Sequence, residues 1–123
     1  MPPERSSGGT PLFRSLDAFW PFYISQHLKP ETRRLHFIGT TSGLACLALA
    51  LLSRRFGLIP AGLASAYGLA WIGHFFVENN KPATFQYPVL SLRADFRMYL
   101  LMWKGEMEKE MARLRDEISR HLA

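Results

Sequence analysis

The sequence predicts an all-α protein, a small integral membrane bundle built on a transmembrane helical hairpin. Three observations support this fold class. The apolar residues are concentrated between Phe37 and Val77. One short polar turn, Ser53–Gly57, divides that apolar region into two segments, and a short turn between two long helices makes them antiparallel neighbours. The flanks are polar and charged, which predicts amphipathic helices beside the hairpin and a charged helix at the C-terminus.

Composition limits the class of protein and its partners. The net charge is +5, yet the Lys and Arg residues form no recognised nucleic-acid-binding motif, so we expect no nucleic acid partner and attribute the basic excess to anionic lipid headgroups. The single cysteine, Cys46, excludes an internal disulfide. We expect a disordered leader over residues 1–11, a membrane-embedded helical domain over 12–104, which would carry any site of the chain, and a charged amphipathic helix over 105–123.

The first predicted helix covers residues 12–28, where aromatic and apolar side chains recur at helical spacing. Pro21 lies inside it and predicts a bend or a new start. The aromatic side chains suit the headgroup level of a membrane, so this helix is placed in or near the interface. Pro30 ends the segment, and Glu31 or Thr32 can open the next helix.

The hairpin is predicted from Arg33 to Leu52 and from Leu58 to Glu78. The apolar part of the first segment has roughly 16 residues, slightly fewer than the ~20 of a full span, and the second is long enough to cross. Small residues recur on one side of each helix, at a spacing that allows close backbone contact. They are Gly39, Gly43, Cys46 and Ala50 in the first helix, and Gly62, Ala66 and Ala70 in the second.

Two histidines lie at the same depth in this hairpin. His36 is 16 residues before Leu52, and His74 is 16 residues after Leu58. At about 1.5 Å per residue, both histidines lie about 24 Å from the turn. Because each also extends the row of small residues, we expect the two imidazoles to meet between the helices.

A fourth helix is predicted after Pro82 and Pro88, with an apolar side and a basic side. It either lies along the membrane or packs on the hairpin. The tail after Glu106 is predicted to be helical, either pairing with a second copy in a homo-oligomer or continuing the fourth helix in solvent. Basic residues are more numerous outside the hairpin than in its turn, so both termini are expected in the cytoplasm, at a bacterial inner membrane or the endoplasmic reticulum.

The histidines suggest a metal site at the cytoplasmic edge. His27, His36 and His74 come from three helix ends near one level, and convergent imidazoles can hold a metal ion with a position left for substrate. Glu78, one turn after His74, could complete the ligand set or accept the other ring N–H of a ligand histidine. The alternative for any one histidine alone is a capping or interfacial hydrogen bond. His121, in the charged tail, is expected to face water.

Two segments also carry a family resemblance. FWPFYISQHLKPETRRLHFIGT and WIGHFFVENNKPA resemble the two signature blocks of the 2-hydroxy fatty acid dioxygenase family, in order, and the resemblance covers the chain from Phe13 to about Trp103. The matching residues of the first block are Phe22, Tyr23, His27, Pro30 and His36. Those of the second block are Gly73, His74, Glu78, Pro82 and Ala83.

The resemblance implies an Fe²⁺ cofactor and an oxygen-consuming α-oxidation, in which a 2-hydroxy fatty acid is shortened by one carbon. His27, His36, His74 and Glu78 would then be the catalytic and metal-binding residues. Basic and tyrosine side chains near that edge are candidates for binding the substrate, although lipid headgroups explain them equally well. They are Tyr23, Arg33, Arg34, Lys81 and Arg93. Members of the family have further apolar segments between the blocks, whereas a single hairpin connects them here.

Two other functions remain open. A non-catalytic membrane protein could assemble through the Gly and Ala rows, with the histidines making hydrogen bonds between helices. A metal enzyme could instead hydroxylate or desaturate lipids, but four histidines are fewer than such enzymes usually carry. Asn79 and Asn80 are expected to cap the second helix of the hairpin.

Overall fold

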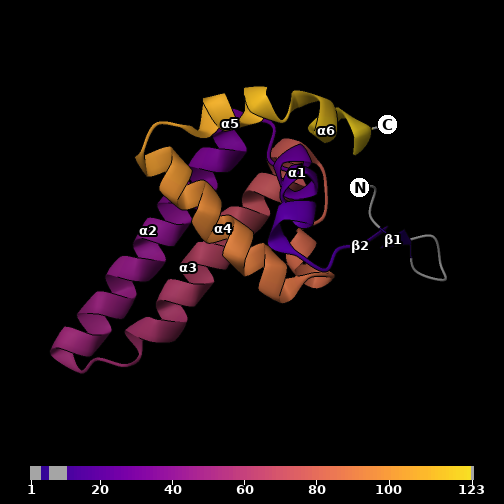
Figure 1. Cartoon of the computed structure of the whole chain (residues 1–123). Helices are drawn as coiled ribbons and strands as arrows, with labels where there is room; N and C mark the ends of the chain where they lie inside the picture. Colours follow the sequence, from indigo (N-terminus) through magenta and orange to yellow (C-terminus); the bar gives the residue numbers. More distant parts are fainter. Residues whose placement is uncertain (1–3, 6–10, 123) are drawn as a thin grey trace. The chain divides into compact units, whose positions relative to one another are not determined.

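The computed structural model describes residues 4–5 and 11–122, which form two compact units. His27–Pro82 form one unit, here called the hairpin unit. The residues up to Gln26 and those from Ala83 onward form the other, the terminal unit. The domain boundaries predicted from the sequence, after residues 11 and 104, stay a prediction. The described residues contain six α-helices and two strands of two residues each, which confirms the all-helical class (Figure 1).

The hairpin unit consists of α2 (Pro30–Ser53), α3 (Leu58–Ile72) and the short helix η1 (Gly73–Glu78). Pro30 occupies the first turn of α2, where its missing N–H leaves no hydrogen bond unmade. Arg54 ends α2 in the left-handed conformation, with φ of 59°. The two long helices run side by side from this turn (Figure 1), so the predicted hairpin and its turn are confirmed.

Close contact between α2 and α3 depends on their small residues. A Cβ atom on Gly39 would lie 3.0 Å from the carbonyl oxygen of Ala66, and one on Gly62 would lie 2.7 Å from the Cβ of Cys46. The backbones therefore approach too closely for larger residues at these positions. The predicted rows of small residues do form the contact between the two helices.

The last turn of the hairpin differs from the prediction. The α-helix expected through Glu78 ends at Ile72, and Gly73–Glu78 form a π-helix, which is wider by one residue per turn. Gly73 allows this turn to lie against α2, because a Cβ there would be 3.0 Å from Cγ2 of Thr32. Asn79 then ends the helix with φ of 60°, as expected of a capping asparagine.

One helix among the described residues, α2, is long and apolar enough to span a membrane. Most of its apolar window is exposed, which differs from the buried core helix of a water-soluble protein. Large apolar side chains such as Leu49, Leu51 and Leu63 are also exposed on the hairpin. The α-helical part of the second predicted span, α3, has only 15 residues. Exposed apolar side chains of this number are typical of a surface that contacts lipid or another protein, and the membrane and the two-span arrangement stay predictions.

The terminal unit contains five helices and the two strands. They are β1 (Glu4–Arg5), β2 (Pro11–Leu12), α1 (Leu16–Ser25), η2 (Ala83–Phe85), α4 (Pro88–Trp103), α5 (Met107–Arg113) and α6 (Arg115–Arg120). The strands pair antiparallel. Most of the predicted leader lies outside the described residues. The hydroxyl of Ser15 caps α1 by accepting from the amide of Ala18 at 3.1 Å. Pro21 lies inside α1 without dividing it, so the expected new start is wrong.

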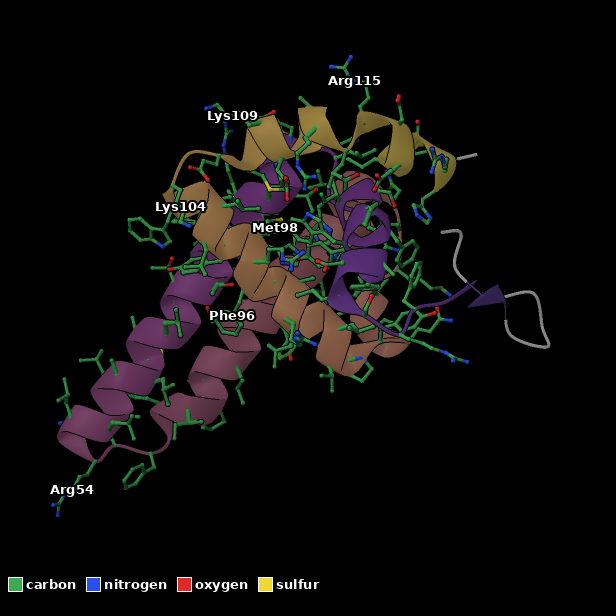
Figure 2. All side chains as sticks on the ribbon, viewed as in Figure 1. Arg54, Phe96, Met98, Lys104, Lys109 and Arg115 are labelled. Carbon is green, nitrogen blue, oxygen red and sulfur yellow. The ribbon has the colours of Figure 1, made fainter. Side chains whose placement is uncertain are left out.

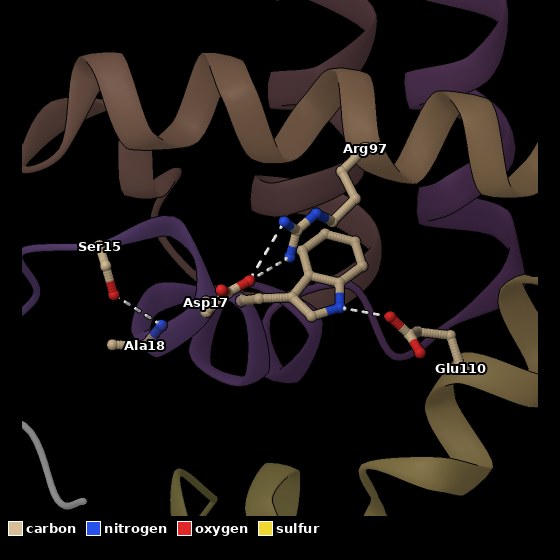
Figure 3. Close-up of polar contacts among 6 residues, drawn as sticks. Ser15, Asp17, Ala18, Arg97 and Glu110 are labelled. Atoms are coloured by element: carbon tan, nitrogen blue, oxygen red, sulfur yellow. Dashed lines mark hydrogen bonds and ion pairs between the residues drawn. The ribbon is translucent and has the colours of Figure 1, made fainter.

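Polar contacts join α1 to α4 and α5 within this unit (Figure 3). The guanidinium of Arg97 donates to Asp17 at 3.2 Å and lies 5.3 Å from the ring centroid of Trp20. The indole N–H of Trp20 donates to Glu110 at 3.0 Å. These contacts connect segments that are about 80 to 90 residues apart in the sequence.

The tail is not a solvated continuation of α4. Gly105, with φ of 68°, turns the chain after α4. The tail after this turn has three buried apolar residues: Met107 in α5, Leu114 at the end of α5, and Ile118 in α6. His121 is also half-buried, with its ring centroid 5.7 Å from that of Phe22, so the expectation that it faces water is wrong. The apolar spacing of the tail predicted which residues are buried, but not the turn.

Candidate metal centre

Three histidine side chains come together in the hairpin unit. Nε2 of His36 lies 3.1 Å from Nε2 of His27 and 3.2 Å from Nε2 of His74. All three residues are buried: the exposed fraction is 1% for His27, 7% for His36 and 2% for His74. One nitrogen from each ring lies within 4.8 Å of the other two, a spacing compatible with a shared metal ion. The predicted meeting of His36 and His74 between the helices is confirmed, and His27 joins them.

Each histidine is held by a different segment of the unit. His36 lies on α2, in the second turn of the helix, and His74 lies in the π-helix η1. His27 lies in the irregular segment before α2, because α1 ends earlier than predicted, at Ser25. The rings meet at steep angles of 75°, 80° and 89°. At these angles one nitrogen atom of each ring can approach the other two without the rings stacking.

Arg33 fixes the segment that carries His27. Its Nη1 donates to the backbone carbonyl oxygens of His27 and Leu28, both at 2.7 Å, and the side chain is buried. A buried guanidinium that donates to two carbonyl oxygens holds the backbone in one conformation. The sequence also predicted that Arg33 binds substrate; that role stays a prediction, and the contacts seen here position a histidine.

Asn80 sets the orientation of the His74 ring. Nδ1 of His74 donates to Oδ1 of Asn80 at 2.6 Å, and the backbone N–H of Asn80 donates to the carbonyl oxygen of His74 at 2.8 Å. A proton on Nδ1 leaves the lone pair on Nε2, the atom that faces the other histidines. This role was expected for Glu78 and was missed for Asn80, which the sequence suggested only as a cap.

Glu78 contacts the segment before α2. Its Oε1 accepts from the backbone N–H of Lys29, while the Lys29 ammonium donates to the carbonyl oxygen of Val77 at 2.8 Å. Glu78 therefore joins the end of η1 to the segment that carries His27. It is not part of the group of converging ligand atoms found among the described residues, and its role as a metal ligand stays a prediction.

The other predicted substrate-binding residues lie in different surroundings. Arg34, Lys81 and Arg93 are exposed. Tyr23 belongs to the terminal unit, where its hydroxyl donates to the carboxylate of Asp95. Burial raises the pKa of Asp95 to about 7, and burial with the nearby carboxylate raises the pKa of Tyr23 well above its usual value. The contribution of these four residues to substrate binding stays a prediction.

The arrangement of the histidines fits a metal cation. Because Nδ1 of His74 carries the proton, Nε2 of His74 can only accept a hydrogen bond. Nε2 of His36 lies beside Nε2 of both His27 and His74, and a single N–H on it can donate to only one of them. One cation would satisfy all three inward lone pairs at once. Three neutral imidazoles suit iron, zinc or copper, and the nitrogen set alone does not select among these metals.

Comparison with known proteins identifies a family. The model of a family described as 2-hydroxy-palmitic acid dioxygenase Mpo1-like matches residues 13–107. No curated protein and no solved structure matches the chain.

Proposed function

Since the chain belongs to the 2-hydroxy-palmitic acid dioxygenase Mpo1-like family, we propose that it is an iron(II)-dependent dioxygenase of 2-hydroxy fatty acids. It would convert each substrate to the fatty acid one carbon shorter, at a membrane. The observation that carries the proposal is the buried group of three Nε2 atoms from His27, His36 and His74. The family description supports a dioxygenase that acts on a 2-hydroxy fatty acid, and the three nitrogens could hold the metal.

The proposed reaction balances with O₂ as the only oxidant. A 2-hydroxy acid and O₂ give the shortened carboxylic acid, CO₂ and water. Ferrous iron, when bound, would supply activation of O₂ and a place for the hydroxyl and carboxylate oxygens of the substrate, provided that the protein occupies only about three positions. The residues described above would keep the three nitrogens in place: Asn80 by fixing the His74 tautomer, and Arg33 and Glu78 by holding the segment before α2.

The membrane would supply the substrate. The exposed apolar surface of α2 suits lipid, and a fatty acid in the same bilayer could extend its chain along the hairpin. His36 and His74 lie at the end of the hairpin opposite the Arg54 turn, so the acid group would reach them near the membrane edge. Exposed basic residues are proposed to attract that acid group, with both termini in the cytoplasm. They are Arg34 and Lys81.

The direct test is oxygen consumption by the purified full chain in detergent or lipid, loaded with ferrous iron under anaerobic conditions. We expect uptake of O₂ with 2-hydroxypalmitic acid and a product shortened by one carbon, identified by mass. Palmitic acid and 3-hydroxypalmitic acid serve as controls, since neither presents adjacent hydroxyl and carboxylate groups. His74→Ala should lose both iron and activity while its circular dichroism remains helical. Equal turnover by wild type and His74→Ala would reject the proposed centre.

A non-catalytic membrane protein is the second candidate. The short distances between the histidine Nε2 atoms favour it, because one of these contacts can be a hydrogen bond when no metal is bound. This function predicts that His36→Gln, which retains a polar side chain, changes assembly or thermal stability but leaves metal content at zero in both proteins. Iron bound by wild type and lost in His36→Gln would favour the enzyme.

A further inference from the structure

Helix α4 presents an apolar surface that the terminal unit does not bury. Its members recur every three or four residues and are between 42% and 69% exposed. They are Val89, Leu92, Phe96, Leu100 and Trp103, called here the α4 stripe. The opposite side of the helix holds the buried residues Ser91, Ala94 and Met98. Figure 2 labels one residue of each side, Phe96 and Met98. The α4 stripe is therefore additional to the side that packs into the unit.

Basic side chains border the α4 stripe on one side. At about 100° per residue, Arg93, Arg97 and Lys104 follow the stripe around the helix before the buried side begins. Arg93 and Lys104 are exposed, whereas Arg97 pairs with Asp17 at 3.2 Å. The one acidic residue of α4, Asp95, lies beyond the other border, where it accepts from Tyr23. The exposed part of the helix thus combines apolar and positively charged surface.

We propose that the α4 stripe binds the surface of an anionic phospholipid bilayer, with α4 parallel to the membrane plane. A helix of 16 residues, about 24 Å long, is too short to span a bilayer but suits the boundary between headgroups and acyl chains. The apolar side chains enter this boundary, and the basic border contacts lipid phosphates. Trp103, at the end of the stripe, has the side chain that is enriched at this level of membranes.

Two observations favour lipid over a protein as the occupant. The same chain carries α2, which is long and apolar enough to span a membrane, and its insertion as proposed above would keep a bilayer close to every copy of α4. A second copy is less suitable, because an antiparallel pair of these helices would bring their basic borders together. The inference concerns a surface of the terminal unit and does not depend on metal binding or catalysis.

Spin labels can test the position of the stripe in the full chain. In a Cys46→Ala background, single cysteines replace Leu92, Phe96 or Leu100 on the stripe, and Lys109 on α5 is the exposed control. Each labelled protein is reconstituted into vesicles of phosphatidylcholine with phosphatidylglycerol. Collisions of the label are measured with O₂, which concentrates in lipid, and with a water-soluble nickel chelate.

We expect O₂ collisions to exceed nickel collisions at the three stripe positions and the reverse at position 109. Vesicles of phosphatidylcholine alone, or Arg93→Gln with Lys104→Gln, should shift the stripe positions toward nickel. Stripe labels that nickel reaches as easily as position 109 would overturn the proposal. So would labels shielded from both reagents, which indicates a protein cover, or spin–spin broadening, which indicates a second copy. Equal results in both kinds of vesicle would reject the requirement for anionic lipid. Helical circular dichroism of each variant shows that it has folded.

Discussion

Removal of the Asn80 side chain should weaken metal binding without changing the fold. The side chain accepts the Nδ1 proton of His74 at 2.6 Å and so keeps the lone pair on Nε2. In Asn80→Ala the ring can turn and exchange its tautomer. Loss of a hydrogen-bond partner of this kind lowers metal affinity about ten- to hundredfold, or about 1.4 to 2.8 kcal/mol. The backbone bond from Asn80 to the carbonyl oxygen of His74 remains, so the end of η1 should persist.

Competition with a chelator of known affinity, under anaerobic conditions, measures this loss. Two variants serve as controls. Asn80→Asp keeps an oxygen acceptor for Nδ1 and should bind iron at least as well as wild type. Asn79→Gly keeps the left-handed residue that ends η1, at φ of 60°, and does not alter the bond to the ring. If Asn80→Ala bound iron as tightly as wild type, the role assigned to this hydrogen bond would be wrong.

Three further predictions concern helix contact, loop position and pH. Gly62→Ala should lower the free energy of unfolding by about 1 to 3 kcal/mol, because the new Cβ would lie 2.7 Å from the Cβ of Cys46 on α2. A Cβ on Gly68 would meet nothing within 4 Å, so Gly68→Ala should be neutral or stabilising. Thermal unfolding of the two variants measures the difference. Arg33→Met removes both hydrogen bonds to the backbone before α2 and should reduce iron content at limiting metal, while the exposed Arg34→Met should not. Burial raises the pKa of Asp95 from 3.8 to about 7, so the folded chain holds this proton more tightly than the unfolded chain. The contribution of this proton to the free energy of unfolding is then complete below the unfolded pKa and is lost as pH rises through about 7. Across this pH range the melting temperature should therefore fall less in Asp95→Asn than in wild type. The same slope of melting temperature against pH in both proteins would contradict the assignment.

The depth of the histidines was the part of the site that sequence predicted best. Equal spacing from the turn places His36 and His74 at one level, because rise per residue is nearly the same in the two helices. The small residues fixed which sides face each other, since only those sides allow the backbones to approach. Together these two rules predicted the convergence without any knowledge of a family.

The partner of the His74 ring was predicted less well. In an α-helix Glu78 lies one turn beyond His74 on the same side, and this made it the expected acceptor. The π-helix from Gly73 to Glu78 changes that register, and the following left-handed residue at Asn79 returns the chain so that Asn80 reaches the ring. Apolar periodicity carries no information about one extra residue in a single turn.

The end of α4 shows a similar limit. The apolar residues of the tail have helical spacing that is compatible with α4 continuing without interruption. The left-handed Gly105 instead turns the chain, and Met107 is then buried. Glycine permits this conformation but does not require it, so only the packing of the folded unit decides.

The proposed catalysis requires one iron ion bound by three imidazoles. X-ray absorption of the full chain loaded with one equivalent of ferrous iron measures the number of histidine ligands. We predict scattering from three imidazole rings in wild type and from fewer rings in His27→Ala, His36→Ala and His74→Ala. An iron site without histidine scattering, or one that is the same in wild type and all three variants, would contradict it.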